Sequence, residues 1–389
     1  MLRTRPKGPL VLFVAALLIL AACGTSDSDT PATTEGAAPT TTEAAPTTTE
    51  APIDTTPENR NIRVMPATLA QFLPIYVAEA QGFFAHYGID PEILAFEGGA
   101  SRSTEAVLSG EADLGYTSWP LAFSLAERGQ QLKFITTHAY YAIEDGVDYS
   151  THRLIVTEDS PIQTIADLEG ARIGVIARGS NEEAFLISML TDVGVDPASV
   201  ELVEAFWGAH PDLLAAGEID VGYMIYPFVG MAGIPYGATE GNGLRSIGDP
   251  YTGGTNGIPE MLGDRGAGMF PMAATEKFVG KNPNTIRAWA FAIRDAHKWI
   301  IDNPEEALVL SEAVTGVPAA AQKFNPPHLY VTWPENWEDQ MRRVADLMVT
   351  ADLLSPDLNV NSFISYLPFT EEEMIVNGRS FPWDPSTLP

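Results

Sequence analysis

The chain has one cysteine, Cys23, among its 389 residues. Disulfides within the chain are therefore excluded, as are zinc sites built from several cysteine thiolates. Basic residues are also scarce: 22 lysines and arginines stand against 51 aspartates and glutamates, so the formal net charge is −29. A surface this acidic repels the phosphates of nucleic acids, and we therefore expect no nucleic acid partner.

Long apolar runs are absent except for one near the start of the chain. Residues 10–22 form an unbroken apolar stretch, shorter than the roughly 20 residues that a membrane-spanning helix needs. Three basic residues precede this stretch, in the order typical of a secretory signal. The sequence LAAC, which ends at Cys23, resembles the bacterial lipobox. We therefore predict a lipoprotein signal peptide over residues 1–22 and a lipid on Cys23 that anchors the chain at the extracytoplasmic face of the cell membrane. An ordinary cleaved signal with an incidental cysteine is the alternative.

Residues 23–61 contain almost nothing that a folded core could bury. Threonine, proline, alanine and glutamate dominate this segment, with EAAPTTT as a typical stretch. Such a composition cannot offset the entropy of the chain. We predict a disordered linker between the membrane and the folded part.

From residue 62 onward, short apolar runs alternate with helical patterns. A strand at 62–67 precedes a helix at 74–86, and the same alternation restarts after residue 150. Alternation of this kind is typical of βαβ units and of mostly parallel sheets. The sequence predicts an α/β protein with two doubly wound lobes: lobe 1 over 62–150, lobe 2 over 151–262, and a helical return to lobe 1 over 263–389.

The last third carries strong helix signals. Asn282 followed by Pro283, and Asn303 followed by Pro304, are typical starts of helices. An apolar stripe with helical spacing follows the first start. It consists of Ile286, Trp289, Ala290, Ile293, Ala296, His297 and Ile300.

The ordered series QFLPIYVAEAQGFFAHYGIDPEILAFEGG, AVLSGEADLGYTS, TIADLEGARIGVIARGS, AAGEIDVGYMI and KNPNTIRAWAFAIRDAHKWIIDNPEEAL resembles solute-binding proteins of ABC importers. The group it resembles serves nitrate, aliphatic sulfonates, taurine and thiamine-pyrimidine precursors. The resemblance implies the type II periplasmic binding protein fold, with two lobes, a two-strand hinge and a ligand cleft between them. It also implies a monomer without cofactor or metal that passes a small-molecule ligand to the ABC permease subunits.

Ligands of α/β sheets bind beyond the carboxyl ends of the strands, so the loops at those ends supply the candidate contacts. Hydroxyls and aromatic rings gather there in both lobes, and the glycines allow close approach of a ligand. The predicted ligand-binding residues are Thr68, Phe72, Gly99, Ser101, Arg102, Tyr116, Thr117, Ser118, Trp119, His138, Tyr140, Arg178, Gly179, Ser180, Trp207 and Tyr226.

Several of these residues have a structural explanation as well. Ser180 and Glu183 match the capping-box pattern S-x-x-E, and the aromatic residues could belong to the core. Glu182 and Glu183 place negative charge in the first turn of a helix, where it would partly cancel the field that attracts anions. The aromatic side chains suit a planar ligand. These features favour a planar heterocycle such as a pyrimidine over a sulfonate, taurine or nitrate, which remain alternatives.

An enzymatic role is not expected. No G-x-S-x-G elbow accompanies the six histidines, and no spacing of histidine or cysteine suggests a metal site. A fungal pyrimidine synthase shares the expected fold but carries a cysteine-rich motif, and this chain has no cysteine after Cys23. A sensor or interaction lipoprotein with the same cleft is the second hypothesis, and a scavenging hydrolase is a weaker third. The glycine-rich stretch 251–268 is interpreted as a surface loop rather than a flap over the cleft.

Overall fold

The protein is described from a computed structural model. The predicted signal peptide, Cys23 and most of the predicted linker lie outside the described residues, as does most of the glycine-rich stretch, 251–266. The structure describes residues 55–96, 99–138, 140–141, 143–144, 147–148, 152–234, 238–248, 267–268, 271–322, 329–330, 337–350, 353–363 and 378–379.

The first of the two larger sheets has the strand order β2-β1-β3-β15-β4. β1 runs parallel to β2 and β3, whereas β15 runs antiparallel to β3 and β4. The strands are β1 (Arg63–Met65), β2 (Glu92–Ile93), β3 (Leu114–Tyr116), β4 (Leu132–Thr137) and β15 (Pro271–Thr275).

The second sheet has the strand order β10-β9-β11-β8-β13-β12. β9, β10 and β11 are parallel, and β8 is antiparallel to both β11 and β13. The strands are β8 (His152–Thr157), β9 (Arg172–Val175), β10 (Glu201–Glu204), β11 (Val221–Ile225), β12 (Glu240–Gly241) and β13 (Leu244–Gly248).

The chain enters the second sheet by β8 and returns to the first by β15. Both are reversed relative to their neighbours, so each sheet is mixed rather than purely parallel. This return late in the chain explains how residues 271–275 join a sheet whose other strands all lie before residue 138. The α/β class with two sheets is confirmed, whereas the predicted lobe boundaries and hinge stay predictions.

Two smaller sheets use short strands. One has the order β14-β5-β16-β17 and the other pairs β6 with β7. Their strands are β5 (Tyr140–Tyr141), β6 (Ile143–Glu144), β7 (Val147–Asp148), β14 (Ala267–Gly268), β16 (Leu329–Tyr330) and β17 (Gly378–Arg379).

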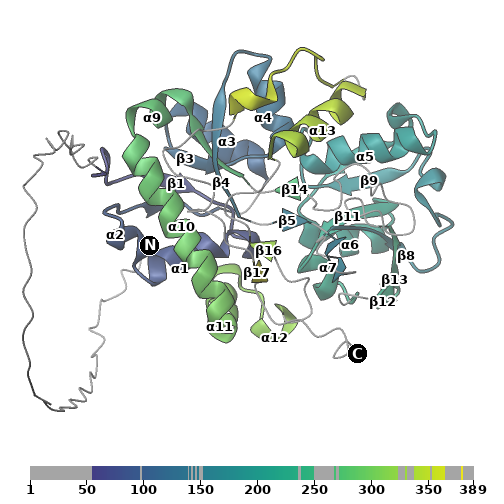
Figure 1. Cartoon of the computed structure of the whole chain (residues 1–389). Coiled ribbons are helices and arrows are strands. Elements are labelled where there is room, and N and C mark those ends of the chain that lie inside the picture. Colours follow the sequence, from purple (N-terminus) through teal and green to yellow (C-terminus); the bar gives the residue numbers. More distant parts are fainter. Residues whose placement is uncertain are drawn as a thin grey trace, which may run out of the picture. The chain divides into compact units, whose positions relative to one another are not determined.

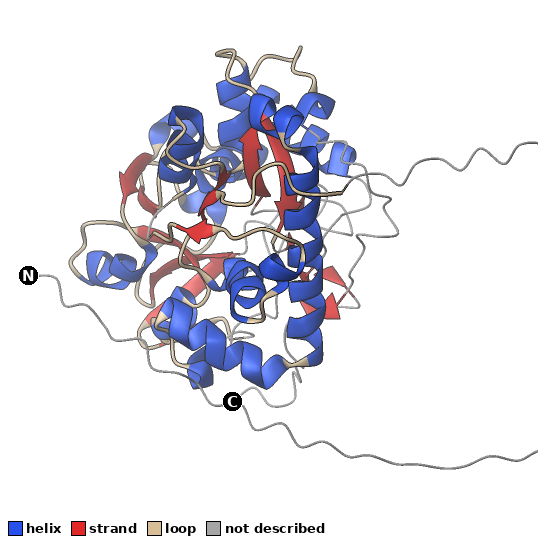
Figure 2. Cartoon of the chain, turned by 90° about the vertical axis from the view of Figure 1, so that its left-hand side faces the viewer, coloured by secondary structure: helices blue, strands red, loops and turns tan. Residues whose placement is uncertain are grey.

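Helices flank the strands of both larger sheets (Figure 2). Figure 1 shows α1, α3 and α10 with the first sheet and α5, α6 and α7 with the second. α13 packs against both α4 and α5. The α-helices are α1 (Leu73–Ala80), α2 (Phe83–His86), α3 (Ala100–Ser109), α4 (Trp119–Ala126), α5 (Asn181–Asp192), α6 (His210–Ala215), α7 (Phe228–Met231), α9 (Glu276–Lys281), α10 (Pro283–Asp302), α11 (Pro304–Thr315), α12 (Ala319–Gln322) and α13 (Trp337–Thr350). Short 3₁₀ helices are η1 (Ala70–Phe72), η2 (Ile165–Asp167), η3 (Pro197–Ser199), η4 (Trp207–Ala209) and η5 (Val360–Phe363).

A sequence repeat underlies the likeness of the two sheets. GEADLGY at 110–116 builds β3, and GEIDVGY at 217–223 leads into β11. The aspartate of each copy binds an arginine at the start of the neighbouring strand: Asp113 pairs with Arg63 at 3.1 Å, and Asp220 pairs with Arg172 at 2.8 Å. Each aspartate also accepts the backbone N–H of its arginine. The repeat therefore fixes the same strand pair in both sheets.

The second glycine of each copy is required by close packing. A Cβ added to Gly115 would lie 2.7 Å from the Ser103 hydroxyl on α3, and one added to Gly222 would lie 3.2 Å from the Cβ of His210 on α6. A side chain at either position would push the helix away from its strand.

The helix predicted over 74–86 is split. α1 ends at Ala80, and Gly82 adopts a φ of 75° before α2 begins at Phe83. Glycine tolerates this left-handed conformation, so the chain turns where the apolar pattern alone suggested one continuous helix.

The apolar stripe predicted on the 20-residue helix α10 is buried as expected. It packs on α1, α2 and β4, and Trp289 stacks on Phe84 at a centroid distance of 5.1 Å. One core cluster includes residues of both larger sheets, and a second, smaller cluster lies in the second sheet and its helices. Within the described residues, no helix has the length and apolarity to cross a membrane.

The start of α10 differs from the prediction. The side chain of Asn282 donates to Phe278 O rather than capping α10. The cap comes instead from Glu58, whose carboxylate accepts the N–H groups of Asn284 at 3.1 Å and Thr285 at 2.9 Å. Residues 55–61, assigned from sequence to the linker, thus include a segment bound to α10. Burial opposes the charged form of Glu58, but the hydrogen bonds from Asn284 and Thr285 outweigh it and lower the pKa of this carboxyl.

Replacing Glu58 with glutamine is expected to lower the free energy of unfolding. The neutral amide accepts fewer of the helix N–H bonds and lacks the charge that the helix start favours, an effect of about 1 kcal/mol for comparable caps. Because folding lowers the pKa of Glu58, its contribution is full above the unfolded pKa and is lost progressively as the pH falls through the folded pKa. Urea unfolding of Glu58→Gln at pH 7 and pH 3 measures both effects. Glu169→Gln, in an exposed turn, is the control, and equal stability of both variants at pH 7 would contradict the assigned cap.

Candidate functional site

A small cavity is lined by residues from both larger sheets and their helices. Its free volume is about 30 Å³, which is room for about one water molecule. Four lining residues belong to α3, β3 or the loops beside them, and six come from the side of the second sheet. They are Gly99, Ala100, Tyr116, Ser118, His152, Ile176, Ser180, Asn181, Glu182 and Trp207.

Glu182 is the carboxylate in this cavity, with only 2% of its surface exposed. Its Oε1 accepts the indole N–H of Trp207 at 2.6 Å, and its Oε2 accepts the backbone N–H of Ile176 at 2.7 Å. His152 Nε2 lies 3.9 Å from Oε1. Burial raises the pKa of Glu182 to about 8, and the bonds from Ile176 and Trp207 limit the rise. A carboxyl group is thus held inside the cavity by two fixed donors.

Three backbone N–H groups of the loop before α5 donate hydrogen bonds to glutamate side chains of the protein. Ile176 N–H donates to Glu182, Arg178 N–H donates to Glu204 at 3.0 Å, and Gly179 N–H donates to Glu183. Glu182 and Glu183 also occupy the first turn of α5. Three N–H groups that precede α5 are therefore already bonded to carboxyl groups of the protein and are not available to an external anion.

Two further rings lie on the side of the first sheet: Phe72 next to the cavity residue Tyr116, and His138 next to Phe72. Phe72 meets Tyr116 edge to face at a centroid distance of 4.9 Å and lies 5.5 Å from the His138 ring. His138 is buried; burial, followed by the neighbouring His297, holds its pKa well below the usual range. His138 is therefore neutral near pH 7 and adds no positive charge to the site.

Four buried polar side chains at the carboxyl ends of β1, β3 and β4 have an atom without a hydrogen-bond partner. They are Gln71, Trp119, Thr137 and His138. Both amide atoms of Gln71 are affected, and its side chain is fully buried. Such groups are rare in folded proteins, and each calls for an explanation.

Five predicted ligand-binding residues meet in the cavity. They are Gly99, Tyr116, Ser118, Ser180 and Trp207. Two of them also have structural roles: Ser118 caps α4, and Ser180 caps α5 by accepting the N–H of Glu183, as the capping pattern predicted. The reciprocal bond differs, because Glu183 accepts from Gly179 rather than from Ser180.

Three predicted residues lie on exposed surfaces away from the cavity lining. Arg102 pairs with Glu111 at 2.7 Å, and Ser101 lines a separate groove of about 430 Å³ between α3 and α4. Arg178 is exposed and lies 3.9 Å from both Glu183 and Glu204. Gly179, beside it, has a φ of 71°, a value that suits glycine at this turn.

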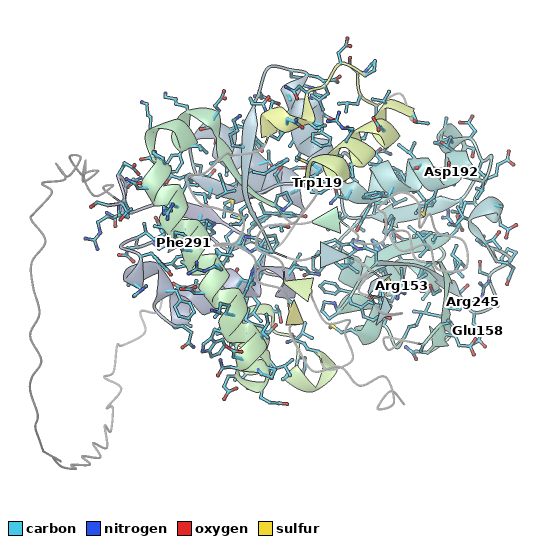
Figure 3. The ribbon with its side chains drawn as sticks, viewed as in Figure 1. Trp119, Arg153, Glu158, Asp192, Arg245 and Phe291 are labelled. Carbon is cyan, nitrogen blue, oxygen red and sulfur yellow. The ribbon has the colours of Figure 1, made fainter. Side chains whose placement is uncertain are left out.

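The remaining predicted residues pack around the site or away from it. Thr68 donates to Phe96 O. Thr117, just after β3, accepts from the hydroxyl of Thr104 on α3. Trp119 and Phe72 are core residues. Tyr226 donates to Ile234 O in the second core, and Arg153, labelled in Figure 3, places its guanidinium 5.7 Å from the Tyr226 ring. The side chain of Tyr140 lies outside the described residues.

Five lining residues were not predicted from the sequence: Ala100, His152, Ile176, Asn181 and Glu182. His152, at the first position of β8, gave no signal beyond its strand, and Glu182 was interpreted only as a charge on a helix start. A glutamate in a first helical turn is usually solvated, whereas this one is buried and bonded to Trp207 from a later loop. Among the described residues no cluster of three potential metal ligands occurs.

Replacing Glu182 with glutamine is expected to change how stability depends on pH. Between the ordinary pKa of 4.5 and the folded value of about 8, the folded chain keeps a proton on Glu182 that the unfolded chain releases. Stability of the natural protein therefore falls as pH rises through this window, and a glutamine removes that fall.

Urea unfolding of both proteins at pH 5 and pH 8 measures this difference. The free energy of unfolding of Glu182→Gln relative to the natural protein should rise by on the order of 1 kcal/mol or more between the two pH values. Titration of the buried histidines is common to both proteins and cancels. A difference independent of pH would show that the carboxyl is not desolvated.

Comparison with known proteins agrees with this architecture. Residues 69–240 match the family described as NMT1/THI5 like. The structure is similar to the periplasmic aliphatic sulphonate binding protein SsuA from Escherichia coli, with 20% identity, a TM-score of 0.60, and coverage of 80% of this chain and 93% of the other. It is also similar to the periplasmic nitrate-binding protein NrtA from Synechocystis PCC 6803, with 11% identity, a TM-score of 0.59, and coverage of 79% and 85%.

The same fold also occurs in DszB, solved as a mutant in complex with biphenyl-2-sulfinic acid, at 16% identity, a TM-score of 0.52 and coverage of 80% and 98%. A search of curated protein sequences found no match. The resemblance inferred from the sequence is thereby confirmed: residues 69–240 carry the NMT1/THI5-like family pattern, and the described chain has the α/β fold of type II periplasmic binding proteins.

Proposed function

We propose that this chain is the solute-binding protein of an ABC importer. It captures a small planar heterocycle in the cavity between the two sheets and delivers it to a permease. The observation that carries the proposal is the cavity itself, which takes its lining from both sheets and joins Tyr116 of the first to Trp207 of the second. A site shared in this way closes when its two halves approach, which is how two-lobed binding proteins retain a ligand.

The cavity, at about 30 Å³, is smaller than a ring-sized ligand, so we interpret it as the site in a closed state. A ring-sized ligand enters only if Tyr116 and Trp207 move apart, so binding is coupled to a movement of the two sheets relative to each other. The buried polar atoms without partners near the same edge, such as the Gln71 amide, would gain hydrogen bonds from a bound solute or the water it orders.

The similarity to sulphonate-binding and nitrate-binding proteins favours an oxyanion as the alternative ligand. The cavity lining offers such a ligand little, because it contains no lysine or arginine. Its buried carboxyl, Glu182, would repel an anion when ionised. For this reason we prefer a neutral or positively charged ring.

Membrane anchoring completes the proposed role. A lipid on Cys23 would hold the folded part near its permease, and the threonine-rich and proline-rich linker would let it move between loading and delivery. A sensor that uses the same cleft without transport is the remaining alternative, and a permease and ATPase encoded beside the gene would argue against it.

Thermal unfolding of the mature protein, residues 23–389, against a panel of solutes tests the proposal. The panel contains thiamine-pyrimidine precursors, riboflavin, taurine, alkanesulfonates and nitrate. A ligand that binds only the folded state stabilises it by about 2.7 kcal/mol at a hundredfold excess over Kd. We expect the melting temperature to rise with a pyrimidine.

A rise with a sulfonate or nitrate alone would keep the transport role and contradict the preference for a ring. No rise with any solute would argue against the proposed function. Trp207→Phe, which keeps an aromatic surface but loses the bond to Glu182, should reduce the ligand-induced rise, whereas Trp299→Phe on α10 should not.

A further inference from the structure

Glu182 has hydrogen-bonding capacity that no described residue uses. A carboxylate can accept about four hydrogen bonds, two at each oxygen. Within the described residues, Oε1 accepts one bond from Trp207 and Oε2 accepts one from Ile176. The remaining acceptor positions belong to a side chain that lines the cavity.

The two bonds that Glu182 does make hold it in place. Ile176 presents a backbone N–H just after β9, and Trp207 presents its indole N–H from η4, so the donors come from two different loops. The carboxyl group therefore cannot turn away from the cavity without leaving two N–H groups unpaired, which is unfavourable. Its orientation is built into the second sheet.

The indole is fixed by the same contact. Trp207 is 4% exposed and stacks on Phe228 at a centroid distance of 5.9 Å. A ring that enters the cavity thus meets an acceptor and the Trp207 side chain as one preformed unit, with Tyr116 contributed from the first sheet.

The cavity lining contains no lysine or arginine, and three N–H groups beside it are already bonded. The N–H groups of Ile176, Arg178 and Gly179 donate to carboxylates of the protein itself. The Arg178 side chain lies on the surface near Glu183 and Glu204. The lining contains one histidine, His152, whose Nε2 already approaches Glu182 at 3.9 Å.

Building on the solute-binding function proposed above, we infer that Glu182 selects the ligand by accepting a hydrogen bond from an N–H group. The ligand is accordingly an aminated planar heterocycle, with its amino group or a protonated ring nitrogen directed at the carboxyl and its flat face near Trp207. A ligand N–H that donates to Glu182 favours the ionised carboxylate, and the ionised carboxylate repels oxyanions.

A matched pair of probes tests this selectivity by isothermal titration calorimetry. The probes are 4-amino-2-methylpyrimidine and 2,4-dimethylpyrimidine, in which a methyl group replaces the amino group. At pH 9, above the folded pKa of about 8, Glu182 is ionised. The natural mature protein should then bind the amino compound at least tenfold more tightly, since a charge-assisted hydrogen bond is lost with the methyl compound. Methanesulfonate should not bind.

The Glu182→Gln and Glu182→Met variants should bring the two pyrimidines to within about threefold of each other, because the charged acceptor is gone. Melting temperatures establish that each variant folds. Glu169→Gln, on an exposed turn, should keep the tenfold preference.

The outcomes separate this inference from the function on which it rests. Equal binding of both pyrimidines by the natural protein, or an unchanged preference in Glu182→Gln, overturns the role of Glu182 while the solute-binding function stands. Tight binding of methanesulfonate also overturns the selectivity and supports an anion transporter instead. Failure of the natural protein to bind any of these probes or any solute of the panel overturns both.

Discussion

The desolvated carboxyl group of Glu182 is the constraint around which the candidate site is arranged. A carboxyl that is 2% exposed must be hydrogen bonded, and the chain meets this requirement with donors from Ile176 and Trp207. The loop between β9 and α5 takes its shape from this need, and η4 is tied to α5 through the indole. Ile176 and Trp207, which line the second sheet's half of the cavity, both donate to this one buried acid.

The first sheet supplies a different kind of half-site. Its contribution is mainly aromatic and neutral, with Tyr116, Phe72 and His138 in contact and several buried polar atoms without partners. The repeated GExDxGY segment explains why the halves correspond: in each sheet an Arg–Asp pair fixes a strand, and a glycine lets a helix pack closely against it. Tyr116 ends one copy and lines the cavity. Tyr223 ends the other and lies 5.6 Å from the ring of the cavity residue His152.

Local sequence patterns predicted the elements well. The stripe on α10, the alternation of strands and helices and the cap at Ser180 follow from spacing and side-chain chemistry within a few residues. The cap of α10 could not be predicted, because Glu58 and Asn284 are 226 positions apart in the sequence. The burial of Glu182 was missed for the same reason, since it depends on Trp207 from a later loop. Loop position alone brought Arg102 into the predicted site, although its charge is paired with Glu111 on the surface.

Hydrogen–deuterium exchange with and without a stabilising solute shows whether one ligand contacts both sheets. We predict slower exchange on binding in two separate regions at once: residues 99–101 and 116–118 beside the first sheet, and residues 176–182 and 205–208 beside the second. Protection confined to one of these regions, or to the groove between α3 and α4 that Ser101 lines, would contradict this prediction.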